Sequence, residues 1–283
     1  MKAQYPLAAM AEALEVSKSG FFAHRHKPQR ARRRQDRVLV ERIQPLFAAS
    51  RQTYGSPRVT MALRQEGHRC GKNRVARRMR ENRLQPRQKR RRWRPATTDR
   101  NHHWPVAENW LAKVPAPASP DQGWVADITS IDTGEGWLYR AGLLDACSRR
   151  CVGGQTAETL ATELVTQAWP KAVRDRRPGP GLLHHSDRGV QYASSAMAAL
   201  LAEQGTAASM SRKANGYDHA MMESFWATLK AECFAGERPS TRQAARLKIF
   251  DSIEGFYNRH RLHSSLNYQS PLAFERAFSY THN

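Results

Sequence analysis

The sequence contains few cysteines and no long apolar stretch. Its four cysteines form no C-x-x-C pair and no zinc-like spacing with histidine, which excludes a disulfide scaffold and a structural zinc site. No apolar run approaches the roughly 20 residues that cross a bilayer, and residues 1–6 lack the apolar region of a signal peptide. We therefore expect a cytoplasmic protein without a membrane partner.

Negative charge is scarce in the first third of the chain. Residues 1–100 carry 27 basic and 7 acidic side chains, a net charge of +20, whereas residues 101–283 carry 19 and 18. A basic segment of this kind suits a polyanion, because each neutralised phosphate releases counterions. Charge alone leaves open a merely solvated basic surface. With 283 residues, the chain is long enough for two or three domains.

Residues 1–36 form a short N-terminal segment with helical patterns. Apolar residues between Leu7 and Leu14 recur with helical spacing, and a second short segment follows around Phe21 and Phe22. Because the pattern is short, it fits a small helix-turn-helix and a plain helical hairpin equally well.

Residues 37–94 have the pattern of a basic helix-turn-helix-like domain that ends in an arginine-rich arm. One helix is expected from about Arg37, and a second opens with Ser56 as its cap and Pro57 in its first turn. Asn73 can cap a third, arginine-rich helix, and such a pair of helices is typical of DNA-reading units. The expected DNA contacts are Arg74, Arg77 and Arg78 on this helix and Arg90, Arg91 and Arg92 in the arm.

Residues 95–120 contain five prolines and little periodicity, which predicts a linker. Beyond it, residues 121–283 have the pattern of a mixed α/β domain, in which short strands come first and helices then alternate with strands. This order predicts a five-stranded mixed sheet with helices on its faces. The expected strands are 124–131, 137–145, 151–155, 181–186 and 206–210, and the expected helices are 158–176, 194–204 and two that begin near 220 and 241.

Three acids lie at particular places in these elements. Asp127 is within the first strand, Asp187 follows the fourth, and Glu223 is near the start of the helix after the fifth. If the first and fourth strands are neighbours, both aspartates reach one end of the sheet. Clustered carboxylates supply oxygen ligands for one or two Mg²⁺ ions, which stabilise the entering and leaving oxygens of a displacement at phosphorus. Lys230 lies about 10 Å from Glu223 along the same helix face, where a solvated ion pair is the alternative.

The run 184–189 gathers two imidazoles, a hydroxyl, an acid and a base before a glycine turn, which favours a ligand site over a surface acid. Together with the acids, this run closely resembles the second-reading-frame product of IS3-family insertion-sequence transposases, within the superfamily of DDE transposases and retroviral integrases. The resemblance extends over nearly the whole chain, and the ordered agreement makes it specific. The matching motifs are 124–129, 185–189, 191–194, 209–213, 222–225, 228–230, 256–259 and 270–271.

The resemblance implies an RNase H-like fold in which Asp127, Asp187 and Glu223 are the catalytic, metal-binding acids, with two Mg²⁺ or Mn²⁺ ions. It also implies cleavage by water at the terminal inverted repeats of the element, followed by attack of the freed 3′-hydroxyl on target DNA. The expected partners are DNA, the first-reading-frame product and further copies of this chain on DNA, since the active protein of this family is usually a frameshifted fusion. We expect association with the nucleoid when DNA is bound.

Several basic residues are expected to accompany these acids. Arg188, Arg212, Lys213 and Lys230 are predicted to bind phosphate near the metals, although plain surface charges fit equally well. Residues 258–263 are predicted to contact DNA or to hold the subunit assembly.

The sequence departs from the family pattern at Val190, Ala214, Gly216 and His219, the last within Asp-His-Ala in place of the more usual Asp-Asn-Ala. Because the three acids and Lys230 are kept, we expect a competent enzyme.

Three other functions fit part of this evidence. A hydrolytic nuclease of the same fold uses the same acids and stops after water attack, whereas a non-catalytic DNA-binding regulator needs residues 1–100 alone. A regulatory or structural partner of the full transposase would keep the active site intact but use it only after fusion or complex formation. The basic helical region favours recognition of element ends over non-specific nicking, and a regulator leaves the acids unexplained.

Overall fold

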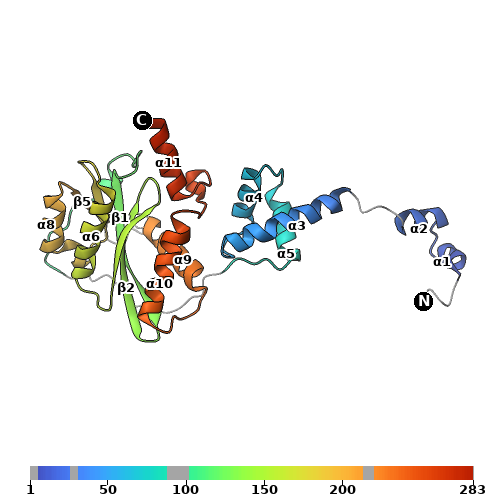
Figure 1. Ribbon diagram of the computed structural model, residues 1–283, viewed down its shortest axis with the longest axis horizontal. Coiled ribbons are helices and arrows are strands. Elements are labelled where there is room, and N and C mark those ends of the chain that lie inside the picture. Colours follow the sequence, from blue (N-terminus) through green and yellow to red (C-terminus); the bar gives the residue numbers. More distant parts are fainter. Residues whose placement is uncertain (1–5, 26–30, 88–101, 213–219, 283) are drawn as a thin grey trace. The chain divides into compact units, whose positions relative to one another are not determined.

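The computed structural model describes residues 6–25, 31–87, 102–212 and 220–282. The chain divides into two compact units, Met1–Gln85 and Pro86–Asn283. None of the helices in these described ranges combines the length and the apolar character needed to cross a membrane. The described helices of the first unit are α1 (Leu7–Ala13), α2 (Lys18–Arg25), α3 (Ala31–Ala49), α4 (Ser56–Gln65) and α5 (Lys72–Glu81) (Figure 1).

The helices α3, α4 and α5 pack around one small core. Its residues recur every three or four positions along each helix, as the apolar pattern predicted. α3 begins at Ala31 rather than near Arg37, because the arginines that open it are good helix formers without apolar periodicity. The buried side chains are Leu39, Ile43 and Phe47 of α3, Val59 and Leu63 of α4, and Val75 and Met79 of α5.

The predicted side-chain caps of α4 and α5 are wrong. Gly55 and Gly71 occupy the N-cap positions, and neither helix has a side-chain hydrogen bond at its cap. Ser56 is already helical, and its carbonyl accepts a hydrogen bond from the Thr60 hydroxyl at 2.6 Å. Asn73 is an exposed residue in the first turn of α5.

A five-stranded mixed sheet of order β3-β2-β1-β4-β5 lies at the centre of the second unit. β1, β2 and β3 form an antiparallel meander, while β4 and β5 run parallel to β1. The predicted mixed sheet is therefore confirmed, and its first and fourth strands are neighbours. The strands are β1 (Gly123–Thr133), β2 (Gly136–Asp145), β3 (Cys151–Ala157), β4 (Leu183–Ser186) and β5 (Ala207–Met210).

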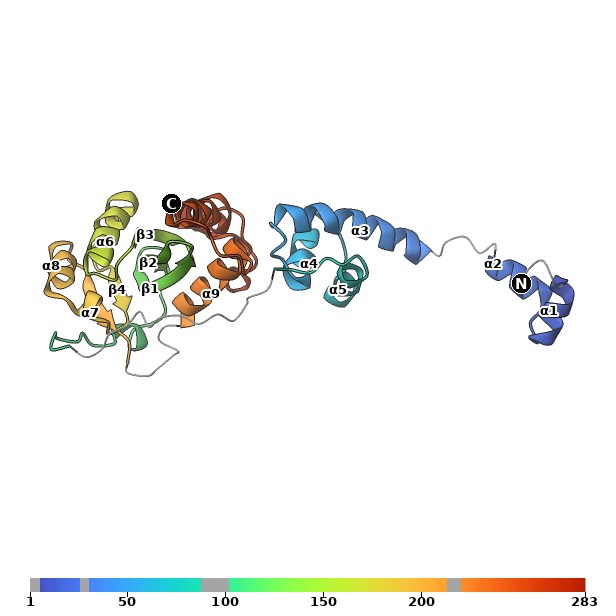
Figure 2. The same cartoon turned by 90° about the horizontal axis from the view of Figure 1, so that it is seen from below.

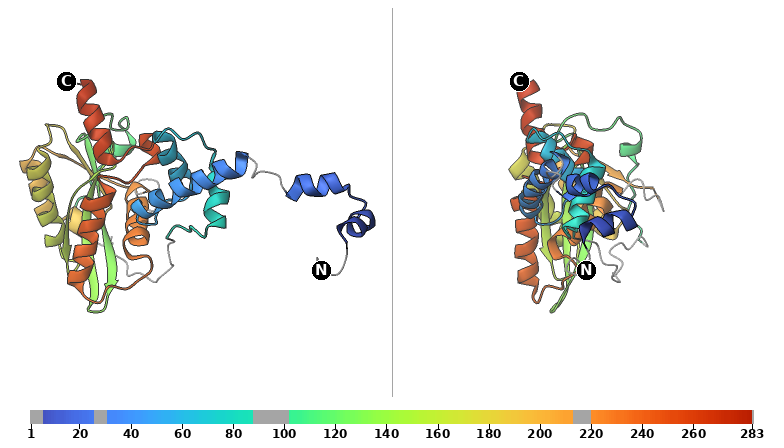
Figure 3. Two further views of the ribbon diagram at one scale, coloured as in Figure 1. Left: turned by 45° about the vertical axis from the view of Figure 1, so that its right-hand side comes forward. Right: turned by 90° about the vertical axis from the view of Figure 1, so that its right-hand side faces the viewer.

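Helices cover both faces of this sheet. In Figures 2 and 3, α6 and α8 lie on one side and α9 and α10 on the other. The remaining elements connect these layers. The helical elements are η1 (Trp110–Ala112), α6 (Glu163–Arg176), α7 (Val190–Ala193), α8 (Ser195–Glu203), α9 (Ala220–Phe234), α10 (Arg242–Phe250), the π-helical η3 (Asp251–Tyr257), η4 (Ser264–Leu266) and α11 (Pro271–His282).

β1 is buried on both faces, so its alternating side chains enter two different cores. Trp124, Ala126 and Ile128 pack with α6 and α8. Val125 and Ile131 pack with α9 and α10. The side chain at any position of β1 is thereby directed toward one known set of helices.

One predicted element on the α6 side differs from the structure. α6 begins five residues later than expected, and the Glu158 carboxylate forms an ion pair with Arg242 of α10 at 2.9 Å. The helix expected at 194–204 is confirmed as α8, and Ser194 caps it by accepting a hydrogen bond from the Met197 N–H.

The described part of the predicted linker contains one 3-10 turn and no strand. It nevertheless belongs to the second unit, because Ala107 and Leu111 pack against the two cores of the sheet. The Leu111 N–H also donates a hydrogen bond to the Ser209 hydroxyl at 3.2 Å.

Candidate active site

Asp127 lies in the middle of β1, directly opposite Gly142 of β2. It is two residues from Val125, which packs against α9, so the alternation of the strand directs Asp127 toward α9 as well. Trp226 of α9 meets it there, where the indole Nε1–H donates a hydrogen bond to Asp127 Oδ2 at 3.1 Å. Asp127 is thus a half-buried carboxylate between the sheet and α9.

Asp187 follows β4 directly. β4 runs parallel to β1 with His185 opposite Val125, so two further residues on each strand bring Asp187 level with Asp127. Asp187 is 6% exposed, and its Oδ1 accepts a hydrogen bond from the Gly189 N–H at 3.0 Å. The turn after β4 therefore orients this carboxylate at the same end of the sheet.

Glu223 lies in the first turn of α9, where its residue is exposed. One face of the helix is buried through Met222, Phe225 and Leu229. This division follows the helical period, and it confirms the predicted apolar face of α9. Glu223 is exposed at the edge of this buried face, close to one helical turn before the buried Trp226.

The charges of Asp187 and Glu223 act on the carboxyl group of Asp127. Burial is the main cause that raises the pKa of Asp127 to about 7, and the negative charge of Asp187 acts in the same direction. The charge of Glu223 adds a smaller effect, while hydrogen bonds to Asp127 oppose the shift. Negative charge therefore accumulates where solvent is scarce, which favours a bound cation.

The donor set fits a hard divalent cation, because carboxylate oxygens are the preferred ligands of Mg²⁺ and Mn²⁺. Within the described ranges, no group of three or more His, Cys, Asp or Glu side chains forms a preassembled metal cluster. The structure instead presents two aspartates at one end of the sheet, with a glutamate that acts on Asp127 through its charge. An open arrangement leaves coordination positions for water and phosphate.

The imidazoles that precede Asp187 belong to the core, so the interpretation of residues 184–189 as a single ligand cluster is wrong in this respect. The His184 ring meets the Trp169 ring edge-on, with the ring centroids 5.1 Å apart. Burial lowers the pKa of His184 to about 3. His185 Nδ1 lies 2.9 Å from the Ser209 hydroxyl. Both histidines are almost fully buried and serve packing.

Sequence reasoning missed two aromatic neighbours of the acids. The sequence pattern places Trp226 only on the apolar face of α9, whereas in the structure it also donates a hydrogen bond to Asp127. Tyr192 is buried, and burial and the charges of both aspartates raise the pKa of its hydroxyl. A polar atom on a large apolar side chain is the signal that points to such residues.

Comparison with known proteins decides the family. Residues 33–92 match a model described as an HTH-like domain, and residues 117–216 and 204–271 match two models that are each described as an integrase core domain. The insertion element IS600 uncharacterized 31 kDa protein of Shigella sonnei is 42% identical over 270 residues, which are 95% of this chain and 98% of that protein. Transposase InsF for insertion sequence IS3A of Escherichia coli (strain K12) is 35% identical over 280 residues, 97% of this chain and 95% of that protein. The chain belongs to the IS3 family of insertion-sequence transposases.

Solved structures also resemble this transposase. A chain of the simian T-cell lymphotropic virus intasome in complex with PP2A regulatory subunit B56 gamma has 11% identity and a TM-score of 0.48, with 82% of this chain and 74% of that chain covered. The catalytic core domain of BIV integrase has 15% identity and a TM-score of 0.42, with 57% and 97% covered. The family assignment rests on the sequence relatives, which identify a polynucleotidyl transferase with a DNA-binding HTH-like domain and a core of the metal-dependent type.

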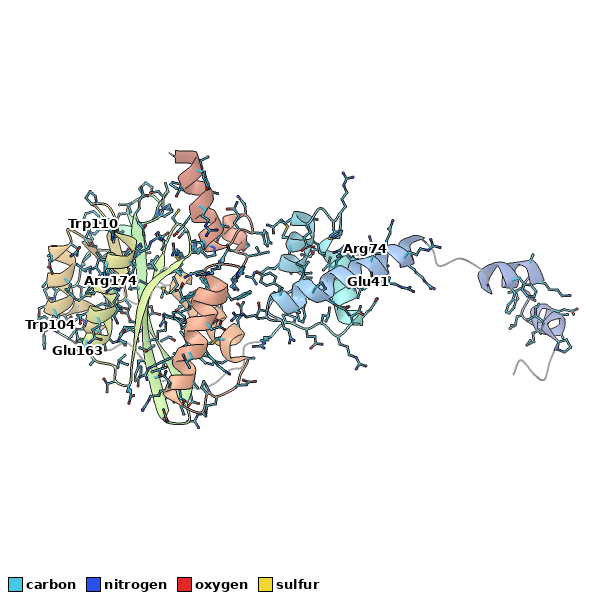
Figure 4. All side chains as sticks on the ribbon, viewed as in Figure 1. Glu41, Arg74, Trp104, Trp110, Glu163 and Arg174 are labelled. Carbon is cyan, nitrogen blue, oxygen red and sulfur yellow. The ribbon has the colours of Figure 1, made fainter. Side chains whose placement is uncertain are left out.

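The arginines of α5 differ in their surroundings. Arg74, labelled in Figure 4, donates from Nε to Asp36 Oδ1 of α3 at 2.7 Å, and Arg78 Nη1 lies 3.8 Å from Asp36 Oδ2. Arg78 also pairs with Glu81 at 2.8 Å. Arg77, in contrast, is exposed. Of the three arginines predicted to bind DNA on this helix, Arg74 and Arg78 thus also hold α5 against α3.

The basic residues near the acids are also in different settings. Arg188 is half-buried and donates from Nε to the Ser211 carbonyl at 2.6 Å, whereas Arg212 is exposed and Lys230 is half-buried. Their contacts with DNA stay predictions. Lys213, Arg90, Arg91, Arg92 and His219 lie outside the described residues.

Two residues predicted to contact DNA or hold the assembly instead have partners inside the domain. Asn258 is buried and exchanges two hydrogen bonds of 3.0 Å with the backbone of Cys151, at the start of β3. Arg261 is 4% exposed and forms an ion pair with Glu232 of α9 at 2.7 Å. Asn258 thereby fastens the C-terminal segment to the sheet, and Arg261 fastens it to α9.

Proposed function

We propose that Asp127, Asp187 and Glu223 are the catalytic acids of this transposase and hold two Mg²⁺ or Mn²⁺ ions. The main support is that the two aspartates lie level on the adjacent strands β1 and β4, together with the effect of the Glu223 charge on Asp127. When bound, such ions stabilise the charge that develops on the attacking and leaving oxygens at phosphorus.

The reaction that fits this site has two displacements. In cleavage at an inverted repeat, a water oxygen bonds to phosphorus while the bond from phosphorus to the 3′ oxygen breaks, which leaves a 3′-hydroxyl. In strand transfer, that hydroxyl loses its proton and bonds to a target phosphorus, and a target 3′ oxygen leaves and takes up a proton. The second step exchanges one phosphodiester for another, so it needs no nucleotide cofactor.

The protein contributes orientation to both steps. The Gly189 N–H holds Asp187, and the Trp226 indole holds Asp127. Glu223 lies on the exposed side of α9, from which it reaches bound DNA. Lys230, about 10 Å further along the helix, is placed to bind a backbone phosphate.

We further propose that the chain acts on element ends and target DNA as an assembly of several copies with the first-reading-frame product, in the cytoplasm at the nucleoid. The support is the relationship to the IS3 transposases and the strongly basic first hundred residues. Contacts by Arg77, Arg90, Arg91, Arg92, Arg212 and Lys213 belong to the same proposal.

The decisive experiment uses labelled DNA that carries the inverted repeats of the host element, with Mg²⁺ or EDTA, and with and without the upstream product. Wild type is compared with Glu223→Gln and with Glu203→Gln, which changes an exposed glutamate at the end of α8. We expect joined product only with Mg²⁺, its loss in Glu223→Gln, and its retention in Glu203→Gln.

Other outcomes identify other functions. Hydrolysis without joining, lost in Glu223→Gln, indicates a nuclease of the same fold. Specific binding without chemistry, even with the upstream product fused to the chain, indicates a DNA-binding regulator. Product made equally well in EDTA contradicts the metal-dependent site.

A further inference from the structure

Trp226 connects the helix that carries Glu223 to the strand that carries Asp127. Its indole Nε1–H donates to Asp127 Oδ2 at 3.1 Å, and the residue is only 3% exposed. A buried N–H that loses its acceptor is costly, because no water replaces it. The hydrogen bond therefore fixes the indole and the carboxylate relative to each other.

Gly142 provides the space that the indole occupies. It pairs with Asp127 across the antiparallel strands, so both residues belong to the sheet face that α9 covers. A Cβ atom on residue 142 would lie 2.5 Å from Cη2 and 2.8 Å from Cζ2 of Trp226. A side chain at this position would displace the indole from its place beside Asp127.

Neighbouring rings hold the indole from the side. The ring centroids of Phe225 and Trp226 are 4.8 Å apart, and Tyr257 meets Phe225 edge-on at 4.9 Å. Trp226 follows Glu223 by three residues, close to one helical turn. Any rotation or sliding of α9 that displaced Glu223 would also break the hydrogen bond to Asp127.

We propose, on the basis of the catalytic role assigned above to Asp127, that Trp226 is a positioning residue for strand cleavage and transfer. It sets the rotation of the Asp127 carboxylate and fixes α9, and with it Glu223, relative to β1. Both acids are then held in one geometry toward the divalent cation. The side chain is buried and acts through Asp127 rather than on the DNA. Residues that orient metal ligands in this way typically change metal affinity or activity about 10- to 100-fold.

Trp169 offers a matched comparison within the same domain. It is 1% exposed and meets Trp124 edge-on at 5.5 Å, and its Nε1 has no hydrogen-bond partner among the described residues. Replacement of either Trp169 or Trp226 by Phe removes an indole from a core. Only the change at Trp226 removes a hydrogen bond to an acid of the site.

The first test compares Trp226→Phe, Trp169→Phe and Asp127→Asn in the full chain with the upstream product. The single-turnover rate constant for end cleavage is measured across Mg²⁺ concentrations, together with affinity for the DNA end and Tm. We expect Trp226→Phe to slow cleavage about 10- to 100-fold and to need more Mg²⁺ for half-maximal rate. Its DNA affinity and Tm should match those of Trp169→Phe. Equal rates and Mg²⁺ requirements in the two Phe variants overturn the proposal.

A spectroscopic test does not depend on activity. The chain has seven tryptophans, and the indole resonance missing from the ¹⁵N–¹H spectrum of Trp226→Phe identifies Trp226. We expect this N–H to exchange slowly with solvent, to shift in Asp127→Ala, which has no acceptor, and to shift when Mg²⁺ alone is added to the wild type. A resonance that responds to neither change contradicts the proposal.

A third test uses the space at Gly142. Gly142→Ala should slow cleavage in the wild type but have a smaller effect in Trp226→Phe, because Phe lacks the outer ring atoms that a Cβ would meet. Additive effects of the two substitutions count against the proposal. If Gly142→Ala does not fold, the rate comparison and the indole resonance decide.

Asp127→Asn separates two kinds of failure. Wild-type cleavage by this variant means that the role proposed for Asp127 is wrong. An inactive Asp127→Asn, together with Trp226→Phe that behaves like Trp169→Phe, means that only the positioning role is wrong.

Discussion

Burial keeps His184 neutral, and this gives the stability of the core a pH dependence. Burial, aided by the charge of His185, lowers the pKa of His184 to about 3, whereas an exposed histidine in the unfolded chain titrates near 6.5. Between these values the unfolded state binds more protons. The free energy of unfolding therefore falls as the pH is lowered, by up to about 1.4 kcal/mol per pH unit. We expect His184→Gln to lose less stability than the wild type between pH 6.5 and 4, measured by denaturant unfolding.

The control for this prediction is His103→Gln, because His103 is exposed. It should follow the wild-type pH dependence, because this substitution leaves the buried His184 in place. A His184→Gln curve that runs parallel to the wild type from pH 6.5 to 4 would show that this histidine is protonated in the folded protein.

At the scale of residues, the placement of the two aspartates on neighbouring strands could be predicted, and the side chains that support them could not. Asp127 and Asp187 stand out because a carboxylate within or just after a buried strand loses its hydration. That loss costs free energy unless the carboxylate is paired or binds a metal ion. Trp226 carries no such signal, since an apolar ring on the inner face of a helix is normal. Its hydrogen bond depends on the distance between α9 and β1, which is a property of packing.

At the scale of elements, the arginines of α5 divide into those that pair with α3 and one that is exposed. Arg74 pairs with Asp36 of α3, whereas Arg77 is exposed on the same helix. We expect Arg77→Ala to weaken binding to the element end by about 1 to 3 kcal/mol without lowering Tm. Arg74→Ala should lower the Tm of this domain, because Asp36 loses its closest partner. Affinity is measured by fluorescence anisotropy and Tm by calorimetry.

Asp36→Asn tests this division from the acidic side. It should resemble Arg74→Ala in Tm and leave the Arg77 contact in place. If Arg77→Ala lowers Tm as much as Arg74→Ala does, both arginines support the fold and the division is wrong.

The C-terminal helix α11 is fastened by an ion network. Glu275 Oε2 accepts hydrogen bonds from Arg150 at 2.6 Å and from Arg176 at 2.9 Å, and Arg176 also pairs with Asp121 at 2.6 Å. Because these side chains are largely shielded, Glu275→Gln should destabilise the core by up to about 3 kcal/mol, measured by denaturant unfolding.

The matched control is Asp175→Asn on α6. The ion pair between Arg174, labelled in Figure 4, and Asp175 leaves both side chains more than half exposed, so its loss should change stability by less than about 1 kcal/mol. Equal effects of the two substitutions would mean that the Glu275 network contributes no more than a surface pair.

Among the elements, those with a strong period could be predicted and their ends could not. The meander β1–β3 follows from the glycines and polar turn residues that bound its strands, and the buried face of α9 follows from helical spacing. α6 starts late, and Glu158, where the helix was expected to begin, pairs with Arg242 some 80 residues later in the chain. A local pattern contains no information about such a distant partner.

At the scale of the whole molecule, positive charge is concentrated before residue 100. Replacement of Arg90, Arg91 and Arg92 by Gln should weaken binding to element ends and to unrelated DNA by the same factor. It should also reduce the slope of log K against log salt by up to about 3, because three phosphate contacts are lost. Anisotropy titrations at several salt concentrations check both points. A loss confined to element ends would assign base contacts to this run instead.

The order of domains along the chain could also be predicted, since charge, proline content and the change of periodicity each mark a boundary. The packing of the described part of the linker against the sheet domain could not be predicted. Leu111 lies in a proline-containing stretch, but it packs under α9 and its N–H reaches Ser209 on β5. The described part of this stretch is therefore a component of the catalytic core.

The Glu275 network also has a consequence for how the second unit folds during translation. Asp121 precedes β1, whereas Glu275 is on α11, so the ribosome makes the two ends of this network more than 150 residues apart. Until α11 emerges, Arg176 lacks one of its two carboxylate partners. A prematurely terminated chain should therefore remain open to proteases, and folded catalytic cores should accumulate only from completed translation.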